Sequence, residues 1–281
     1  MTSTAYETIE SRFREISLLG EIMEALSWDQ EVYMAPGSVE ARAEQLAWLS
    51  GKAHELLTLP DWEELLEKAE SEKDTLTVWQ KANLREARRE WIHAAALPGK
   101  LVEALTLTTS RAEVAWRNAR NEDDFSIFVP HLVRIIELTR ETASLKAEAL
   151  NTTPYNALLD QFQPGLNTIT IDTVFDSLKD FLPIFLDQVQ NMQTTPDNEL
   201  IFKNSYSGIK QQELSQRIMK ILGFDFDRGR LDISAHPFTT GHPLDARITT
   251  AYRENDPLFA LTATIHETGH ALYELNRDRK S

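Results

Sequence analysis

Apolar residues recur at steps of three and four along most of the chain, the spacing that places them on one face of an α-helix. One such stripe runs through residues 6–26, a second through 62–69 and a third through 174–189. Pro183 lies inside the third stripe and should bend or end that helix near Leu182. We interpret the stripes as buried core, and together they predict a mainly α fold.

After about residue 230 the pattern changes. Residues 231–234 and 247–252 alternate in polarity and carry β-branched side chains, which predicts two short strands and a small β-sheet just before the last helix. The polar residues 191–198 are the best candidate for a boundary. We therefore expect a helical wall or lid over about residues 1–198, followed by the small sheet and a final helix over about 199–281.

Composition excludes several classes of protein. The chain has 29 Lys and Arg against 44 Asp and Glu, a formal charge of −15, so its surface should repel a phosphate backbone and nucleic acid is not an expected partner. Cys is absent, which excludes disulfides, a thiolate nucleophile and a Cys-type zinc site. The first ten residues lack the basic and apolar regions of a secretory signal, and no apolar run is long enough for a membrane span. We expect a soluble, cytoplasmic protein.

The last predicted helix contains the sharpest chemical signal, His266-Glu267-Thr268-Gly269-His270. Asp256-Pro257 supplies a start for that helix, and the apolar pattern continues on both sides of the motif. Two histidines one turn apart can reach one metal ion, and the Glu between them can take a proton from an activated water. Gly269 is unfavourable inside a helix, which indicates that another group approaches the backbone there. The competing interpretation is a surface helix with two incidental histidines.

A zinc site of this kind needs a third ligand. The pattern that places a third His six residues after the second is excluded, because that position is Asn276. Glu274 lies two turns beyond His266, roughly 12 Å along the axis, which is too far to share the ion. Asp278 is farther still. The motif as written is therefore short of a ligand.

Upstream candidates each have an ordinary alternative. His236 and His242 both precede Pro, so either can simply line a turn. Asp245 and Arg247 share one face of a predicted strand, where they can form an exposed ion pair of little energetic value. Asp245 could instead bond the far nitrogen of a metal-bound His.

Three motifs follow one another in close succession: His236-Pro237-Phe238, Asp245-Ala246-Arg247-Ile248-Thr249 and His266-Glu267-Thr268-Gly269-His270. Together they resemble the carboxypeptidase Taq family of thermostable zinc metallocarboxypeptidases. The resemblance begins near residue 28 and includes Trp28-Asp29-Gln30-Glu31, Tyr155-Asn156-Ala157-Leu158-Leu159-Asp160 and Gly223-Phe224-Asp225-Phe226. Although H-E-x-x-H alone is widespread among peptidases, the three motifs together are specific.

The resemblance implies a helical fold with a deep groove, a small sheet near the metal helix, and one zinc ion, with cobalt as an alternative. It assigns His266 and His270 as metal ligands and Glu267 as the catalytic base. His236, Asp245 and Arg247 are placed near substrate or behind the ligands. It also implies release of single C-terminal amino acids from peptides, with broad side-chain tolerance and poor action at Pro, by a homodimer.

The sequence departs from the family pattern in one respect. Family members are nearly twice as long, and their third ligand is the Glu of a later His-Glu-Ser segment. That segment, and the later Ile-Arg-x-x-Ala-Asp and Gln-Asp-x-His-Trp motifs, do not occur here. We therefore expect a truncated, N-terminal part of one catalytic domain, which need not be active alone.

Two other functions remain open at this point. The same zinc chemistry also serves endopeptidases and aminopeptidases. A chain short of its third ligand could instead be a non-catalytic helical fragment that binds peptides or dimerises through exposed apolar surface.

Overall fold

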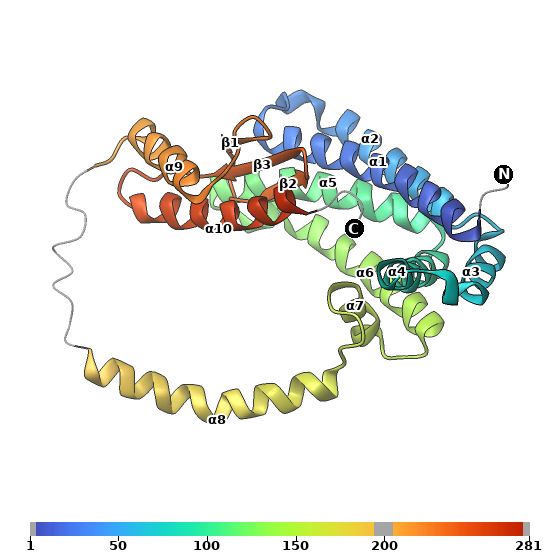
Figure 1. Cartoon of the computed structure of the whole chain (residues 1–281). Coiled ribbons are helices and arrows are strands. Elements are labelled where there is room, and N and C mark those ends of the chain that lie inside the picture. The colour runs from blue at the N-terminus through green and yellow to red at the C-terminus, as the bar shows by residue number, and fades with distance from the viewer. Residues whose placement is uncertain (1–3, 194–204, 278–281) are drawn as a thin grey trace. The chain divides into compact units, whose positions relative to one another are not determined.

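The computed structural model describes residues 4–193 and 205–277 of the chain (Figure 1). These residues form two compact units. One contains the chain up to Thr139 together with the segment from Tyr206 onward, and the other contains Arg140–Ser205. Most of the expected boundary at residues 191–198 and the discounted ligand Asp278 lie outside the described residues.

The fold is mainly helical with one small sheet, as the sequence predicts. The helices of the described residues are α1 (Ala5–Val32), α2 (Val39–Leu57), α3 (Trp62–Ser71), α4 (Val78–Ala95), α5 (Gly99–Glu122), α6 (Val129–Leu150), α7 (Pro154–Phe162), α8 (Thr168–Met192), α9 (Gly208–Leu222) and α10 (Pro257–Asn276). The strands are β1 (Gly229–Ile233), β2 (Thr239–His242) and β3 (Asp245–Thr250). β1 and β3 correspond to the two predicted strands, whereas β2 was not predicted.

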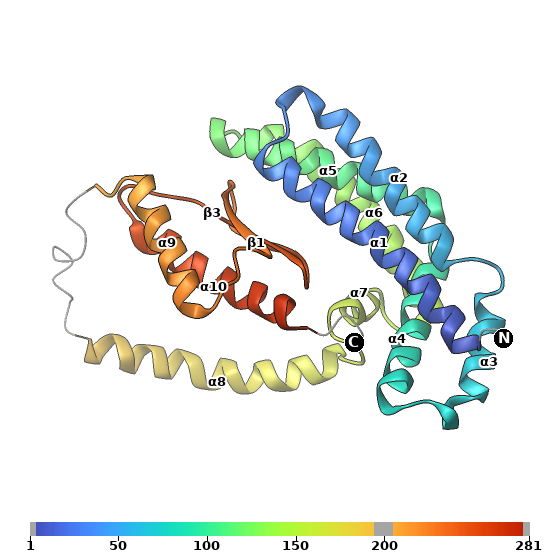
Figure 2. The same ribbon diagram turned by 45° about the horizontal axis from the view of Figure 1, so that its top comes forward.

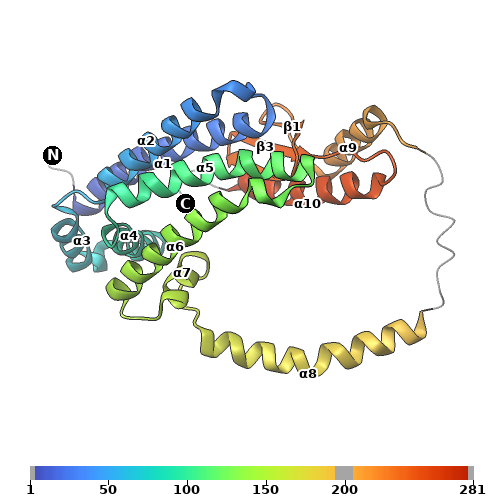
Figure 3. The ribbon, with the colours of Figure 1, turned by 180° about the vertical axis from the view of Figure 1, so that it is seen from behind.

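The first core explains why the N-terminal stripes are apolar. Tyr6 and Ile9 of α1, Trp62 and Leu66 of α3, and Leu84 of α4 are all buried in one cluster. Side-chain caps fix where two of these helices begin. The hydroxyl of Thr4 accepts a hydrogen bond from the Glu7 amide at the start of α1, and Thr77 accepts one from Gln80 at the start of α4. Figure 3 shows α1, α2 and α5 side by side.

The second core lies between the sheet and the C-terminal helices. The strand order is β1-β3-β2, with β1 parallel and β2 antiparallel to β3. Met219 of α9, Ile248 of β3 and Ala271 of α10 are each inaccessible to solvent in this cluster. Figure 2 shows β1 and β3 beside α9 and α10. The predicted placement of a small sheet against the last helix is confirmed.

The two faces of the sheet have different partners because successive side chains on a strand point to opposite faces. Ile248 and its register partner Thr239 belong to the face that packs on α10. Arg247 and its partners Arg230 and Thr240 belong to the face toward α1. The sheet is therefore a layer between the metal-motif helix and the N-terminal helix.

Trp28-Asp29-Gln30-Glu31 joins α1 to its neighbours. The centroid of the Trp28 ring lies within cation–π distance of two guanidinium groups, 4.3 Å from that of Arg247 and 4.8 Å from that of Arg230. The next three side chains contact α2 and α5: Asp29 pairs with Arg42 at 2.7 Å, Gln30 accepts from Ser110 at 2.9 Å, and Glu31 lies 3.4 Å from Arg117. This stretch of the family resemblance therefore has a structural role.

α8 decides between two alternatives and contradicts one expectation. Of the bend or end expected near Leu182, the end is ruled out, because the helix continues through Pro183 to Met192. One missing hydrogen bond is tolerable here because the helix is exposed, so that water can satisfy the freed carbonyl. The apolar stripe over residues 174–189 is also not buried, since α8 has no buried residue. Among the described residues, no helix combines the length and apolar character that a membrane span requires.

Candidate metal centre

Helix α10 carries the H-E-x-x-H motif, and contacts at its start and near its middle hold it in place. The carboxylate of Asp256 accepts a hydrogen bond from the Phe259 amide at 3.2 Å, and Pro257 is the first helical residue, as predicted. Thr264 and Thr268 are fully buried; the Thr264 hydroxyl bonds Ser215 of α9 at 3.2 Å. These contacts set the rotation of α10, which decides the direction of each motif side chain.

The two histidines of the motif converge. His266 and His270 are exposed, and their Nε2 atoms lie 3.2 Å apart with ring centroids separated by 4.8 Å. A tetrahedral zinc ion with Zn–N bonds of about 2.05 Å separates two nitrogen ligands by roughly 3.3 Å. The pair therefore has the spacing that two ligands of one ion require, and neutral imidazole is an ordinary ligand for zinc and for other divalent transition metals.

Glu267 differs from the two histidines in its exposure. Only 9% of its surface is exposed, in contrast to the histidines on either side of it. Its Oε2 atom lies 2.7 Å from the hydroxyl of Thr239 on β2, and the same hydroxyl lies 2.9 Å from the main-chain oxygen of Glu267. The motif thus presents two outward nitrogen ligands and one carboxylate held at the edge of the sheet.

The third ligand does not come from the described residues. Within residues 4–193 and 205–277, no group of three or more His, Asp or Glu side chains lies close enough to hold a metal ion. Glu274 pairs with Arg277 at 2.9 Å. The residues present fit a metal ion as two of its ligands, and the remaining positions are open to other groups.

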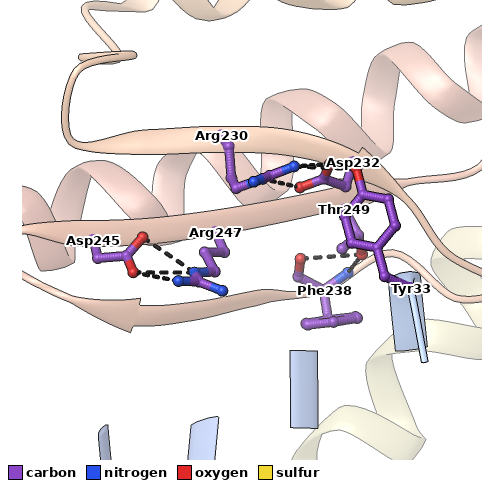
Figure 4. Close-up of polar contacts among 7 residues, drawn as sticks. All are labelled: Tyr33, Arg230, Asp232, Phe238, Asp245, Arg247 and Thr249. Carbon is purple, nitrogen blue, oxygen red and sulfur yellow. Dashed lines mark hydrogen bonds and ion pairs between the residues drawn. The ribbon is translucent and has the colours of Figure 1, made fainter. Parts of the chain in front are cut away.

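The His236-Pro237-Phe238 turn is held by Thr249 of β3 (Figure 4). The Phe238 amide donates to the Thr249 hydroxyl at 3.0 Å, and the Thr249 amide donates to the Phe238 carbonyl at 2.8 Å. Ser234 donates to the His236 carbonyl at 2.6 Å. The His236 side chain is exposed. Hydrogen bonds of the main chain therefore join two of the motifs that carry the family resemblance, those at residues 236–238 and 245–249.

Asp245 and Arg247 form the ion pair that their spacing on one strand face allows. The carboxylate and guanidinium are joined by contacts of 2.6 and 3.1 Å (Figure 4). On the parallel strand β1, Arg230 and Asp232 make the same kind of pair, and the Tyr33 hydroxyl donates to Asp232 at 3.1 Å. The alternative role of Asp245, behind a metal-bound His, stays a prediction.

An open cleft of about 230 Å³ lies between α1 and the β2–β3 hairpin. Its acidic lining includes Glu21, Glu24 and Asp245, and His242 faces Glu21 with an N···O distance of 3.9 Å. Burial raises the pKa of Glu24 above its ordinary value, and the Gly241 amide, which donates to this carboxylate at 3.0 Å, opposes that rise. Gly241 has φ +118°, a conformation that other residues rarely adopt.

Comparison with known proteins decides the family. The profile described as carboxypeptidase Taq (M32) metallopeptidase matches residues 8–281. The chain belongs to this family. It is 35% identical to thermostable carboxypeptidase 1 of Pyrococcus furiosus over 98% of this chain, and 34% identical to carboxypeptidase 1 of Bacillus subtilis over 94% of it. The crystal structure of BsuCP superposes with a TM-score of 0.91 at 32% identity, covering 98% of this chain.

The same comparisons show that the chain spans about half the length of its M32 relatives. The matched share is 55% of the Pyrococcus protein, 52% of the Bacillus protein and 55% of the BsuCP chain. The resemblance inferred from the three motifs is confirmed at the level of the family.

Two features of this M32 site were missed by sequence reasoning. Thr239 contacts Glu267, and its position directly after His236-Pro237-Phe238 was the available signal. The arginine pair around Trp28 joins positions about 200 residues apart, which periodicity does not reveal. The inference that a group approaches Gly269 has no support among the described residues, since a Cβ built there meets no atom within 4 Å.

Proposed function

We propose that this chain carries the metal-binding half of an M32 metallocarboxypeptidase, an enzyme that releases single amino acids from the C-terminus of peptides. The observation that carries the proposal is the convergence of the His266 and His270 Nε2 atoms at 3.2 Å beside the buried carboxylate of Glu267. Membership of the M32 family supports the assignment.

His266 and His270 would hold the metal, for which zinc is the first candidate and cobalt the second. When bound, a divalent ion supplies a Lewis acid for the scissile carbonyl and a more acidic water. Glu267 accepts the proton of the attacking water and returns it to the leaving amine. Because the described residues provide two ligands, the third comes from outside them.

The finer properties carried over from the resemblance belong to the same proposal. They are broad side-chain tolerance with poor action at Pro, a cytoplasmic location and a homodimeric assembly. His236, Asp245 and Arg247 act near substrate or behind the metal ligands. The ion pair of Asp245 and Arg247 at 2.6 Å would fix the orientation of both side chains in either role.

Metal stoichiometry on this 281-residue chain tests the metal half of the proposal. After zinc loading and extensive dialysis, near one zinc per chain, lost in His266→Ala, would indicate that another part of this chain or a second copy completes the ligand set. Little retained zinc would place the third ligand in a longer parent chain. Zinc that is retained equally by His266→Ala and His270→Ala would refute the assignment.

Substrate direction separates a carboxypeptidase from the other zinc peptidases. The metal-loaded enzyme should cleave an N-blocked dipeptide that has a free C-terminal carboxylate, and it should leave intact a dipeptide with a free N-terminus and an amidated C-terminus, because a carboxypeptidase requires the free carboxylate. Cleavage of the amidated peptide would favour an endopeptidase or aminopeptidase.

A further inference from the structure

The side chain of Thr239 makes two contacts with one residue of the metal motif. Its hydroxyl lies 2.7 Å from Glu267 Oε2 and 2.9 Å from the Glu267 main-chain oxygen. A hydroxyl has one proton to donate and can also accept, so it can bond the carboxylate while remaining within reach of the helix backbone. The Thr239 hydroxyl thus connects the carboxylate at the end of the Glu267 side chain to the main chain of the same residue in α10.

Hydrogen bonds of the preceding residue fix the position of the Thr239 backbone. Phe238, the preceding residue, makes two hydrogen bonds to Thr249, of 3.0 Å through its amide and 2.8 Å through its carbonyl. Thr249 is itself fully buried, and its hydroxyl lies 2.7 Å from the Ser234 hydroxyl. The residue after Phe238 therefore enters β2 at a fixed place, in register with Ile248 and on the face of the sheet that packs on α10.

We propose that Thr239 is a positioning residue that fixes the carboxylate of Glu267 for proton transfer during peptide hydrolysis. A free Glu side chain samples many rotamers, and ordering it costs conformational entropy. Thr239 orders the Glu267 side chain in the folded protein before substrate binds. The inference rests on the proposed role of Glu267. It also connects the three motifs, because Phe238 bonds Thr249 and the next residue, Thr239, bonds Glu267.

Three substitutions separate positioning from mere packing. Thr239→Val keeps the shape and removes the hydroxyl, whereas Thr239→Ser keeps the hydroxyl. Thr240→Val is the matched control, because Thr240 lies on the same strand with its side chain toward Glu24 on the opposite face.

The first readout does not depend on activity. Crystal structures of the native chain and the three variants should show the Glu267 carboxylate in one rotamer in the native protein, Thr239→Ser and Thr240→Val. In Thr239→Val the carboxylate should be spread over several rotamers. A single unchanged rotamer in Thr239→Val would overturn the inference, even if no activity can be measured.

The second readout uses the metal-loaded enzyme. Thr239→Val should lower kcat by about 10- to 100-fold, since a small misplacement of a reacting group costs that much, while KM and metal content stay unchanged. Thr239→Ser should recover most of kcat, and Thr240→Val should match the native enzyme. Equal losses in Thr239→Val and Thr239→Ser would indicate a packing role and refute positioning. An inactive native enzyme with an ordered Glu267 would count against the proposed function but not against this inference.

Discussion

Glu267 is buried while His266 and His270 are exposed, and this difference makes their proposed roles separable by single substitutions. In a metal-loaded enzyme, Glu267→Gln should retain the metal and lose turnover by about 100-fold or more, because an amide cannot accept the proton. His266→Ala or His270→Ala should instead release the metal. Metal analysis and peptide hydrolysis on the same samples measure both effects. Near-normal turnover in Glu267→Gln would contradict the assignment.

Glu31, at the contact between α1 and α5, predicts how the free energy of unfolding depends on pH. Burial raises the pKa of Glu31 to about 7, from an ordinary value of 4.5; the nearby Glu113 adds to the rise and Arg117 opposes it. Between these two values the native state holds a proton that the unfolded chain releases. The free energy of unfolding therefore falls as pH rises through this window, and the penalty is complete above about pH 7.

Glu31→Gln removes that penalty. Relative to the native protein, its free energy of unfolding should be higher by on the order of 1–3 kcal/mol at pH 8, and the difference should vanish near pH 4. Urea denaturation at several pH values measures this, with the exposed Glu122→Gln on α5 as the control. A difference that is the same at pH 4 and pH 8 would show that Glu31 carries no such penalty.

At the scale of elements, the sequence predicts what local patterns determine. The stripe through residues 6–26, the strands near 231 and 247 and the Asp256-Pro257 start of α10 are confirmed, because periodicity and capping act within a few residues. β2 was missed because it is four residues long and contains Gly241. The Thr239–Glu267 and Trp28–Arg247 contacts depend on how elements pack, which local patterns do not encode.

Gly269 gives a prediction at this scale. Since a Cβ there meets no described atom, Gly269→Ala should stabilise α10 in this chain by about 0.5–1 kcal/mol through helix propensity alone. Gly241→Ala is the contrasting variant. Its φ of +118° and the clash of an added Cβ with the Asp245 carbonyl oxygen should make it clearly destabilising.

Chemical denaturation of both variants measures the difference. Destabilisation by Gly269→Ala would show that a backbone or side chain from outside the described residues, or from a second copy, packs against that turn.

At the scale of the whole molecule, the chain spans about half the length of its M32 relatives and exposes a long apolar stripe on α8. Phe181 and Phe185 stack at 5.2 Å between ring centroids and are about half exposed, at 56% and 48%. Val174 and Leu178 extend the same stripe by one turn each. A soluble monomer rarely leaves so much contiguous apolar surface uncovered, so this chain should self-associate.

Sedimentation velocity over a hundredfold range of concentration tests the self-association. The average mass of the native chain should rise above 32.1 kDa with concentration. Phe181→Glu with Phe185→Glu should hold it at the monomer mass, because two charges within the stripe cannot be buried without partners. Thr173→Glu with Gln190→Glu adds the same charge to the same helix away from the face of the aromatic pair and should associate like the native chain. A native chain that stays monomeric throughout would mean that a single copy covers its own stripe, and association that survives in the Phe variant would place the interface elsewhere.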